Sequence, residues 1–335
     1  MHQVAVFSSK QYDQVFFKRF NQNNKLSFSF FDTKLTADTV ELAKGYDAVC
    51  IFVNDQADKA TLTQLKSFGI HTIALRCAGF NNIDMPTAKS LGMNICRVPE
   101  YSPEAVAEHT VGLMLTLSRK FHKAYNRIRE DNFALDGLMG FTLHGKTVGI
   151  IGTGNIGLAT IKILVGFGCK ILCLDPEPND AAIALGCQYV NQEQLFKSSD
   201  IISLHCPLLP ATHHIINQDT LALVKPNAML INTSRGGLID SKAVIGALKS
   251  KRLGYLGIDV YELESNLFFE NLSGEIMQDD IFARLSTFPN VLITGHQGFF
   301  TEEALSTIAQ TTIDNLTKLL NGEPVGREFS LYSQF

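Results

Sequence analysis

The sequence lacks a hydrophobic run that could cross a membrane. Its longest apolar runs, such as residues 111–117 and 148–151, are far shorter than the ~18 residues that a membrane span needs. The first residues, MHQVAVFSSK, also lack the basic region and the small-residue cleavage pattern of a signal peptide. We therefore expect no membrane partner and a cytoplasmic location.

Excess basic charge and paired cysteines are also missing. Lys and Arg number 29 against 33 Asp and Glu, a net charge of -4, so no basic face is expected to bind a nucleic acid. The seven cysteines include no CxxC pair and lie mostly in apolar segments, which favours buried free thiols. The pair His213-His214 has no plausible carboxylate or thiol arrangement around it in the sequence, so we expect no metal site.

What is present is a regular alternation of short β-rich segments with longer helical patterns. The length, 335 residues, corresponds to about two domains, and the alternation is typical of βαβ units with parallel sheets. The expected strands are residues 3–7, 48–53, 72–75 and 94–96, then 147–151, 170–174, 201–205, 228–232, 253–259 and 291–294. One long helix, from Pro103 to about Glu130, is expected between the two groups, and a last helix from Glu302 to about Leu320.

A glycine-rich turn follows the strand at residues 147–151. Gly152 allows a tight turn, Gly154 lets the backbone approach a pyrophosphate, and Gly157 permits close contact between helix and strand. Asp175 ends the next strand, eighteen residues after Gly157, where its carboxylate can bind the ribose hydroxyls and repel a 2′-phosphate. The alternative is an ordinary strand-helix turn. Because strand, glycines, helix, second strand and Asp175 occur in order, we expect NAD rather than NADP to bind here.

Polar groups follow four of the later strands, at His205, at residues 232–237, at Asp259 and at residues 295–296. Ligands of open α/β sheets bind at the carboxyl ends of the strands, so these groups are expected to face one crevice. Arg235 lies beside two glycines, and its planar guanidinium suits a carboxylate or an α-keto acid. The alternative role for Arg235 is a surface salt bridge.

His296 is the candidate acid/base. It follows Gly295 at a strand end, which would leave its ring access to the crevice, although a histidine taken alone is more often structural. A proton-transferring histidine needs a carboxylate to orient its ring and to stabilise the charged form. Glu262 and Glu264 are the nearest candidates by topology, and their spacing does not choose between them.

Several motifs together resemble the D-isomer-specific 2-hydroxyacid dehydrogenase family, and within it most closely the fermentative D-lactate dehydrogenase branch. The resemblance covers nearly the whole chain. It rests on the following segments: GTGNIG at 152–157 with Asp175, NTSRG at 232–236, DVYELE at 259–264, TGH at 294–296, RCAGFNNID at 76–84 and VPEYSPEAVAEH at 98–109.

The resemblance assigns roles to individual residues. It implies that Arg235 holds the substrate carboxylate, that His296 is the acid/base, and that Glu264 rather than Glu262 pairs with His296. It also implies a substrate pocket and a cofactor site. The pocket residues are Phe52, Ala78, Gly79, Tyr101 and Phe299, with Arg235; the cofactor residues are Gly152, Thr153, Gly154, Asn155, Ile156, Gly157, Asp175, Cys206, Pro207, Thr212, Thr233, Ser234 and Asp259. For Cys206, the alternative is that only its backbone matters.

The fold that follows is α/β, with two Rossmann-like, doubly wound parallel-sheet domains separated by a deep cleft. Residues 1–100 and 299–335 would form a discontinuous substrate-binding domain, and residues 101–298 the NAD-binding domain. The expected reaction is the reversible reduction of pyruvate to D-lactate by NADH, in a homo-oligomer, a dimer or tetramer, that dimerises through the helical region from Pro103. The alternatives are a sibling enzyme for a bulkier 2-keto acid and, from another class, a nucleotide-sensing protein that resembles the corepressors of this family.

Two departures from the family pattern bear on the substrate. Ser265 follows Glu264 where many relatives carry proline, and a long insertion from Asn266 to about Thr287 resembles the lactate branch. Phe299 stands where related lactate enzymes carry tyrosine, so a pocket hydroxyl is absent and the substrate preference could shift. No long C-terminal extension is present, which argues against a phosphoglycerate dehydrogenase with a regulatory domain.

Overall fold

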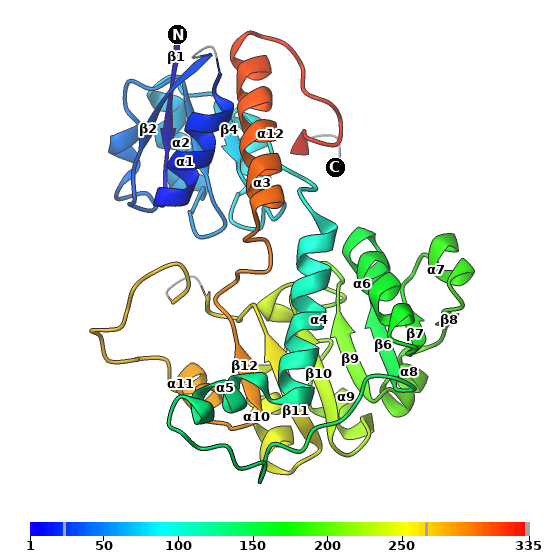
Figure 1. Cartoon of the computed structure of the whole chain (residues 1–335). Coiled ribbons are helices and arrows are strands. Elements are labelled where there is room, and N and C mark those ends of the chain that lie inside the picture. Colours follow the sequence, from blue (N-terminus) through cyan, green and yellow to red (C-terminus); the bar gives the residue numbers. More distant parts are fainter. Residues whose placement is uncertain (23–24, 265–266, 332–335) are drawn as a thin grey trace. The chain divides into compact units, whose positions relative to one another are not determined.

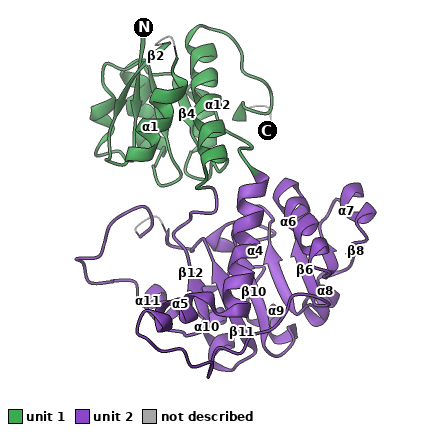
Figure 2. Cartoon of the chain, viewed as in Figure 1, with its two compact units in different colours: residues 1–102, 300–335 green, residues 103–299 purple. Residues whose placement is uncertain are grey.

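The chain folds into two compact units. The computed structural model describes residues 1–22, 25–264 and 267–331. Unit 1 comprises Met1–Ser102 and Phe300–Phe335, and unit 2 comprises Pro103–Phe299 (Figure 2). Both sheets are parallel throughout their described strand pairs, so the predicted α/β fold class is confirmed.

Unit 1 contains a five-stranded sheet in the order β2-β1-β3-β4-β5 (Figure 1). Helices α1 and α12 pack against each other, and α12 also contacts β4 and β5. The elements are β1 (His2–Val6), α1 (Gln11–Phe20), β2 (Leu26–Phe30), η1 (Val40–Ala43), β3 (Ala48–Ile51), α2 (Lys59–Ser67), β4 (Thr72–Leu75), α3 (Met85–Ser90), β5 (Asn94–Cys96) and α12 (Glu302–Leu320). The last helix therefore returns the end of the chain to the unit in which the chain begins.

Unit 2 contains a seven-stranded sheet in the order β12-β11-β10-β9-β6-β7-β8. The order reverses at β6, which pairs with β7 on one side and β9 on the other. The elements are α4 (Pro103–Arg119), α5 (Phe121–Ile128), β6 (Thr147–Ile151), α6 (Asn155–Gly166), β7 (Lys170–Leu174), α7 (Asp180–Ala184), β8 (Gln188–Tyr189), α8 (Gln192–Ser198), β9 (Ile201–Leu204), α9 (Gln218–Leu223), β10 (Ala228–Asn232), η2 (Gly236–Leu238), α10 (Ser241–Lys249), β11 (Leu253–Ile258), α11 (Asp280–Ser286) and β12 (Val291–Ile293). Ligands of such sheets bind outside the carboxyl ends of the strands at this reversal.

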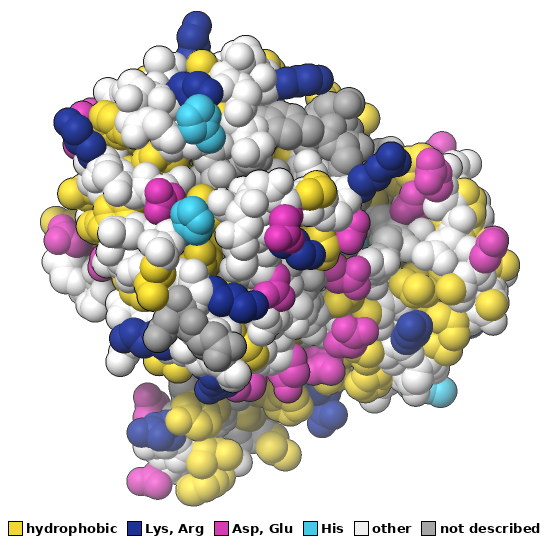
Figure 3. All heavy atoms as spheres, turned by 90° about the horizontal axis from the view of Figure 1, so that it is seen from above, with side chains coloured by type: hydrophobic (Ala, Val, Ile, Leu, Met, Phe, Trp, Pro, Cys, Tyr) yellow, Lys and Arg dark blue, Asp and Glu magenta, His cyan; other side chains and the backbone are white. Residues whose placement is uncertain are grey.

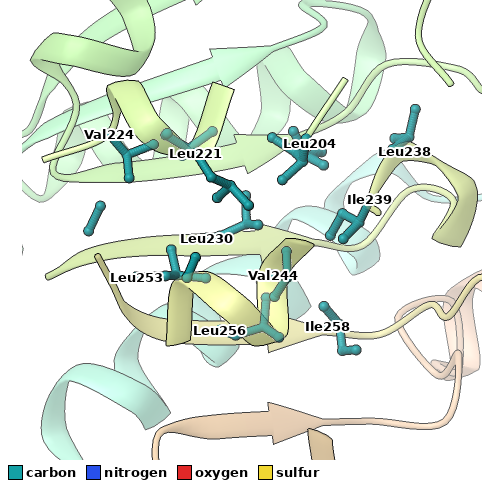
Figure 4. Packing of buried hydrophobic residues seen from close by; sticks show 14 of the residues in the cluster. Leu204, Leu221, Val224, Leu230, Leu238, Ile239, Val244, Leu253, Leu256 and Ile258 are labelled. Atoms are coloured by element: carbon teal, nitrogen blue, oxygen red, sulfur yellow. The ribbon is translucent and has the colours of Figure 1, made fainter. Parts of the chain in front are cut away.

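The sheet of unit 2 is buried on both faces because its strand residues alternate between two cores. In β10, Leu230 packs with residues of α8, α9 and α10, while Met229 and Ile231 pack with residues of α4 and α6. Figure 4 shows Leu230 together with Leu221 and Val244, which come from the helices on the first of these faces. A sheet covered on both faces has only its strand ends and edges left for polar chemistry.

The predicted long helix from Pro103 to Glu130 is wrong in one respect: it is two helices. α4 ends at Arg119, and Lys120 adopts a left-handed backbone with φ 54° before α5 begins. The chain that returns after α5 explains the break, because the Phe141 backbone N–H donates to the Ser118 carbonyl at 3.2 Å. That carbonyl would otherwise accept a helical hydrogen bond.

Two strands, β2 and β8, were not predicted from the sequence. Both lie at an edge of their sheet. β2 alternates phenylalanine with serine and is only partly buried, and β8 has two residues, so neither has the continuous apolar pattern of a central strand. Ser265 and Asn266, on which one departure from the family pattern rests, lie outside the described residues.

The surface and the cysteines give three further observations. Among the described residues, none of the helices combines the length and apolar character needed to cross a bilayer. All seven cysteines are free thiols, and all except Cys169 are buried. On the face shown in Figure 3, Lys and Arg side chains are interspersed with Asp and Glu.

Candidate active site

A histidine and a carboxylate meet beyond the ends of two neighbouring strands. His296 follows β12 and Glu264 follows β11, and His296 Nδ1 lies 2.8 Å from Glu264 Oε1. The other oxygen of Glu264, Oε2, accepts a hydrogen bond from the Tyr261 backbone N–H at 2.8 Å. The side chains are 18% and 22% exposed, so the pair is held in place and still reachable. Of the two glutamates that topology left open, Glu264 is the one that pairs with His296.

Asp259 fixes the turn that carries His296. Its carboxylate accepts hydrogen bonds from the backbone N–H groups of Gln297 and Gly298 at 2.9 and 2.8 Å, and its carbonyl accepts one from His296 N. His296 itself has φ 53°, a left-handed conformation that costs a non-glycine residue free energy. Asp259 is therefore a positioning residue for the His296 ring.

Two polar side chains complete the support around Asp259. His109 Nε2 lies 3.3 Å from Asp259 Oδ1, and Thr294 donates a hydrogen bond to the same oxygen. Burial alone would raise the pKa of Asp259, but hydrogen bonds from His109 and Thr294 outweigh burial and lower the pKa. Both residues belong to segments that resemble the family, at 98–109 and 294–296, but the sequence alone predicted no role for either.

Aromatic rings flank His296 on two sides. The Phe269 ring lies 5.8 Å from it between centroids, and the Phe299 ring lies 6.5 Å away in an edge-on arrangement. Phe299 was predicted as a pocket residue from the family resemblance. Phe269 was missed because it lies inside the insertion, where the sequence carries no periodic pattern that would place it near His296.

Arg235 lies after β10 in a loop braced by its neighbours. Asn232 Nδ2 donates to the Arg235 carbonyl at 2.8 Å, and Asn232 Oδ1 accepts from Ser234 N at 3.0 Å. The guanidinium donates one hydrogen bond, from Nη1 to the Ser234 carbonyl at 2.7 Å. In the described part of the chain no carboxylate forms an ion pair with Arg235. The alternative of a surface salt bridge therefore finds no partner among those residues.

The glycine turn after β6 is closely packed at two of its glycines and open at the third. A Cβ at Gly152, whose φ is 95°, would lie 2.6 Å from the Cys206 backbone nitrogen, and one at Gly157 would lie 2.1 Å from the Gly152 carbonyl oxygen. A Cβ at Gly154, by contrast, would meet nothing within 4 Å, so this position is open. Helix α6 begins directly afterwards with Asn155 and Ile156. These residues fit a dinucleotide, because backbone N–H groups at a helix start bind a pyrophosphate.

Asp175 lies at the end of β7 beside this turn. Its Oδ2 accepts hydrogen bonds from Thr153 N at 2.7 Å and from Thr153 Oγ1 at 3.1 Å, and its Oδ1 accepts one from Glu177 N at 3.0 Å. The carboxylate is thereby fixed next to the glycine turn. A negative charge fixed there is unfavourable for a 2′-phosphate, which favours NAD over NADP.

The loops after β9 and β10 bring together further predicted cofactor residues. Ser234 Oγ donates to the Cys206 carbonyl at 2.7 Å, and Thr212 Oγ1 donates to the Pro207 carbonyl at 2.6 Å. Thr233 Oγ1 lies 2.7 Å from a hydroxyl of α4, that of Thr110. Burial raises the pKa of Cys206 to about 11, so its thiol stays protonated. The contact with Ser234 uses the Cys206 backbone.

Four of the predicted pocket residues, Phe52, Ala78, Gly79 and Tyr101, belong to unit 1 and are described within it. Phe52 is buried; its N–H donates to Asp55 Oδ2 at 2.6 Å, and the Arg76 guanidinium lies 4.8 Å from its ring centroid. The carbonyl of Ala78 accepts from Arg97 Nη1 at 2.8 Å, and that of Gly79 accepts from the Cys77 thiol at 3.3 Å. Tyr101 is half-buried.

The second glutamate, Glu262, has a different partner. Its Oε1 lies 2.7 Å from His214 Nε2, and His213 stacks on His214. The prediction that no carboxylate lies near His213-His214 is therefore wrong. Forty-eight positions separate His214 from Glu262, and the two meet because each follows a strand whose end lies at the same edge of the sheet.

Comparison with known proteins identifies relatives along nearly the whole chain. Residues 111–298 match the family described as "D-isomer specific 2-hydroxyacid dehydrogenase, NAD binding domain". A D-lactate dehydrogenase of Escherichia coli (strain K12) is 52% identical over 325 residues, which cover 97% of this chain and 99% of that protein.

Two solved structures extend this likeness to the fold. The apo-structure of D-lactate dehydrogenase from Escherichia coli has a TM-score of 0.89 at 50% identity and covers 98% of this chain and 99% of its own. The pyruvate reductase of Chlamydomonas reinhardtii has a TM-score of 0.91 at 42% identity, with coverages of 97% and 98%. The fold is thus the Rossmann-like fold of these enzymes.

Proposed function

Because this chain belongs to the D-isomer specific 2-hydroxyacid dehydrogenases, whose cofactor is NAD, we propose that it reduces pyruvate reversibly to D-lactate with NADH. The observation that carries the proposal is the 2.8 Å contact between His296 Nδ1 and Glu264 Oε1. The names of the relatives, D-lactate dehydrogenase and pyruvate reductase, supply the substrate.

In this reaction His296 moves the proton and Arg235 holds the substrate. Bound NADH supplies the hydride that adds to C2 of the 2-keto acid. Nδ1 of His296 is engaged by Glu264, so Nε2 gives the proton to the ketone oxygen. Glu264 stabilises the protonated ring, and the Arg235 guanidinium binds the carboxylate so that one face of C2 is presented to the cofactor. Lactate oxidation runs the same steps in reverse and needs His296 neutral.

The proposed cofactor site is the set of loops at the carboxyl ends of β6, β7, β9, β10 and β11. Gly152, Gly154 and the start of α6 would bind the pyrophosphate, and Asp175 the adenosine ribose. Thr153, Asn155, Ile156, Gly157, Cys206, Pro207, Thr212, Thr233, Ser234 and Asp259 complete the proposed set. Unit 2, residues 103–299, is then proposed to be the NAD-binding domain, which the sequence placed at residues 101–298.

Unit 1 is proposed to be the substrate-binding domain, which residues 1–100 and 299–335 form in the sequence-based division. The backbone groups of Ala78 and Gly79 would help bind the carboxylate, and the Phe52 and Tyr101 side chains would wall the substrate pocket on the unit 1 side. The hydrogen bond from Arg97 to the Ala78 carbonyl supports this assignment, because it fixes the peptide that follows. Phe299, which the structure assigns to unit 2, keeps its proposed role as a pocket residue from the family resemblance.

A homo-oligomer is proposed from the apolar face of α5. Phe121, Tyr125 and Ile128 are 53%, 63% and 54% exposed, and Phe133 and Met139 beyond the helix are 71% and 87% exposed. Contiguous exposed apolar groups mark interaction surfaces. We expect light scattering to report a dimer or tetramer, and the double substitution Phe121→Ser with Ile128→Ser to release monomers.

A fermentative role in the cytoplasm is part of the same proposal. Seven free cysteines favour a reducing compartment, where thiols persist. Re-oxidation of NADH by pyruvate is the reaction that would serve fermentation.

The test is a substrate panel with NADH as the reductant. Pyruvate should give the highest kcat/KM, ahead of hydroxypyruvate, 2-ketoisocaproate and phenylpyruvate. A preference for 2-ketoisocaproate or phenylpyruvate would replace the proposal with a sibling dehydrogenase for bulkier acids. Tight NADH binding without turnover of any acid would favour the nucleotide-sensing alternative.

A further inference from the structure

Three potential metal ligands lie together outside the catalytic pair. His213 and His214 are in the loop after β9, and Glu262 follows β11. One ligand atom from each of the three lies within 4.8 Å of the other two. Within residues 1–22, 25–264 and 267–331, they form the one group of three His, Cys, Asp or Glu side chains with this proximity.

The three side chains are accessible from solvent. His213 is exposed, and the side chains of His214 and Glu262 are each 31% exposed. The two imidazole rings stack with their centroids 3.9 Å apart, and His214 Nε2 lies 2.7 Å from Glu262 Oε1. A nitrogen–oxygen contact of this length holds one proton between two groups that can both bind a metal ion.

The backbone of His214 is fixed rather than free to adjust. Its φ is 51°, in the left-handed region, which non-glycine residues seldom adopt. The His214 N–H donates to the Gly237 carbonyl at 2.9 Å, and Asn217 Nδ2 donates to the His214 carbonyl at 2.9 Å. These bonds hold the imidazole of His214 against Glu262 before any ion arrives.

We propose that His213, His214 and Glu262 bind one divalent transition-metal ion of the zinc class. Two imidazole nitrogens and one carboxylate oxygen, with water as the fourth ligand, are a donor set that Zn²⁺ accepts. Mg²⁺ and Ca²⁺ prefer oxygen ligands only, so they bind here poorly. The ion replaces the proton between His214 and Glu262, and the exposed His213 ring turns out of the stack to direct a lone pair at it.

The position of this site connects it to the loops of the proposed active site. A Cβ at Gly236, next to Arg235, would lie 2.4 Å from the Glu262 backbone nitrogen, so the two loops pack backbone to backbone. Glu264 is two residues beyond Glu262. A bound ion would therefore link the loops after β9, β10 and β11 to one another, without using His296 as a ligand.

The experiment is a zinc titration of the full-length, reduced protein against a chromophoric chelator. Wild type should bind one equivalent of Zn²⁺. His213→Ala, His214→Asn and Glu262→Gln should each weaken the binding by about tenfold or more, because even the loss of a residue that only supports a ligand costs about this much. Asparagine is chosen at 214 because it tolerates a left-handed backbone. Binding should weaken as the pH falls, because protons compete with the metal ion for the imidazole nitrogens.

The matched control is His2→Ala. His2 Nδ1 lies 3.6 Å from Asp47 Oδ2, a histidine–carboxylate pair that belongs to no group of three among the described residues. This variant should bind zinc as wild type does. Failure of wild type to bind zinc, or equal binding by wild type and the three site variants, would overturn the proposal. Zinc binding that is lost only in His296→Asn would overturn it as well, because the ion would then occupy the catalytic pair.

Discussion

The first strand-to-helix turn of unit 1 and that of unit 2 occupy equivalent places in two parallel sheets but have opposite character. In unit 1 the turn between β1 and α1 is filled by side chains. Ser8 Oγ donates to Asp55 Oδ1 at 2.7 Å, and Arg76 Nη2 donates to the Ser8 carbonyl at 2.7 Å. Asp13 also occupies the start of α1, where its carboxylate accepts from Lys10 N at 2.9 Å. A phosphate would meet a carboxylate at this helix start.

In unit 2 the turn between β6 and α6 carries glycines instead. Gly154 precedes the first residue of α6 and has no side chain to accept hydrogen bonds from the helix start. The carboxylate beside this turn, that of Asp175, accepts hydrogen bonds from the backbone N–H groups of Thr153 and Glu177. Parallel-sheet architecture alone therefore does not make a dinucleotide site. The contents of the first turn decide which unit can accept a pyrophosphate.

The two units also differ in how accessible their paired charged groups are to solvent. Arg76 and Asp13 are 1% and 6% exposed in side-chain area, and their Nε and Oδ1 atoms lie 3.1 Å apart. Burial alone would lower the pKa of Arg76, but Asp13 and the other acidic groups around it raise the pKa, so Arg76 stays charged. In unit 2, His296 and Glu264 are paired and still accessible. A closed polar network stabilises the fold, whereas an open pair can exchange a proton with a substrate.

The largest predicted effect comes from substituting His296, one member of the accessible His296–Glu264 pair of unit 2. His296→Asn should lower kcat for pyruvate reduction by about 10²–10⁴-fold, the usual contribution of a positioned acid or base. The dissociation constant of NADH, measured by fluorescence titration, should stay unchanged. A variant with near-normal turnover would remove His296 from the acid/base role.

Substitutions in the buried Arg76–Asp13 pair of unit 1 should lower the stability of the protein rather than its catalytic rate. Arg76→Met should lower the free energy of unfolding of unit 1 by about 3–5 kcal/mol, because Asp13 is left buried without its partner. Arg235→Met in unit 2 should change stability by only about 0.5 kcal/mol, as expected for a residue outside a buried network. Both changes in stability can be measured by amide hydrogen exchange, in strands β1, β3 and β4 for unit 1 and in strands β9 and β10 for unit 2. Equal losses in the two variants would contradict the distinction between the units.

One substitution in each turn tests whether its glycines or side chains decide where NADH binds. Gly152→Ala should weaken NADH binding by about 1–3 kcal/mol, because a Cβ at this left-handed position is strained and meets the Cys206 backbone. The counterpart Ser8→Gly makes the turn of unit 1 more like that of unit 2. It should leave NADH binding as in wild type, since Asp13 and Arg76 still fill the site. Tighter binding or a second equivalent of NADH would contradict this.

The smallest predicted effect is the response to acid. Burial lowers the pKa of His205, after β9, to about 4, so the unfolded chain protonates near pH 6.5 before the folded protein does. Stability should therefore fall as the pH falls from about 6.5 toward 4. Between pH 7 and pH 5 wild type should lose about 2 kcal/mol more than His205→Gln in urea unfolding. In unit 1, burial raises the pKa of Asp55, which works in the opposite direction.

The central strands and the polar residues at their ends could be predicted from the sequence because both depend on local patterns. Every predicted strand has a counterpart in the structure, and the two strands that were missed are edge strands without a continuous apolar run. Spacing could not choose between Glu262 and Glu264, because a loop residue two positions away turns its side chain elsewhere. In the structure Glu262 contacts His214 and Glu264 contacts His296.

Contacts between distant positions could not be predicted from the sequence, because no local pattern in either segment indicates its partner. Asp13 and Arg76 are 63 positions apart, and neither segment carries a signal of the other. The same holds for Phe269 beside His296, and for His109 beside Asp259. These side chains meet only because the sheets bring their strand ends together, which is a property of the tertiary fold.

We expect the dinucleotide to bind at the glycine turn of unit 2, where Gly154 is open, and not at the filled turn of unit 1. Hydrogen–deuterium exchange of the wild-type protein with and without NAD⁺ tests it most directly. Exchange should slow at residues 152–157, 175–177 and 206–212 when NAD⁺ is present, with no change at residues 8–13. Protection at residues 8–13 without protection at residues 152–157 would contradict it.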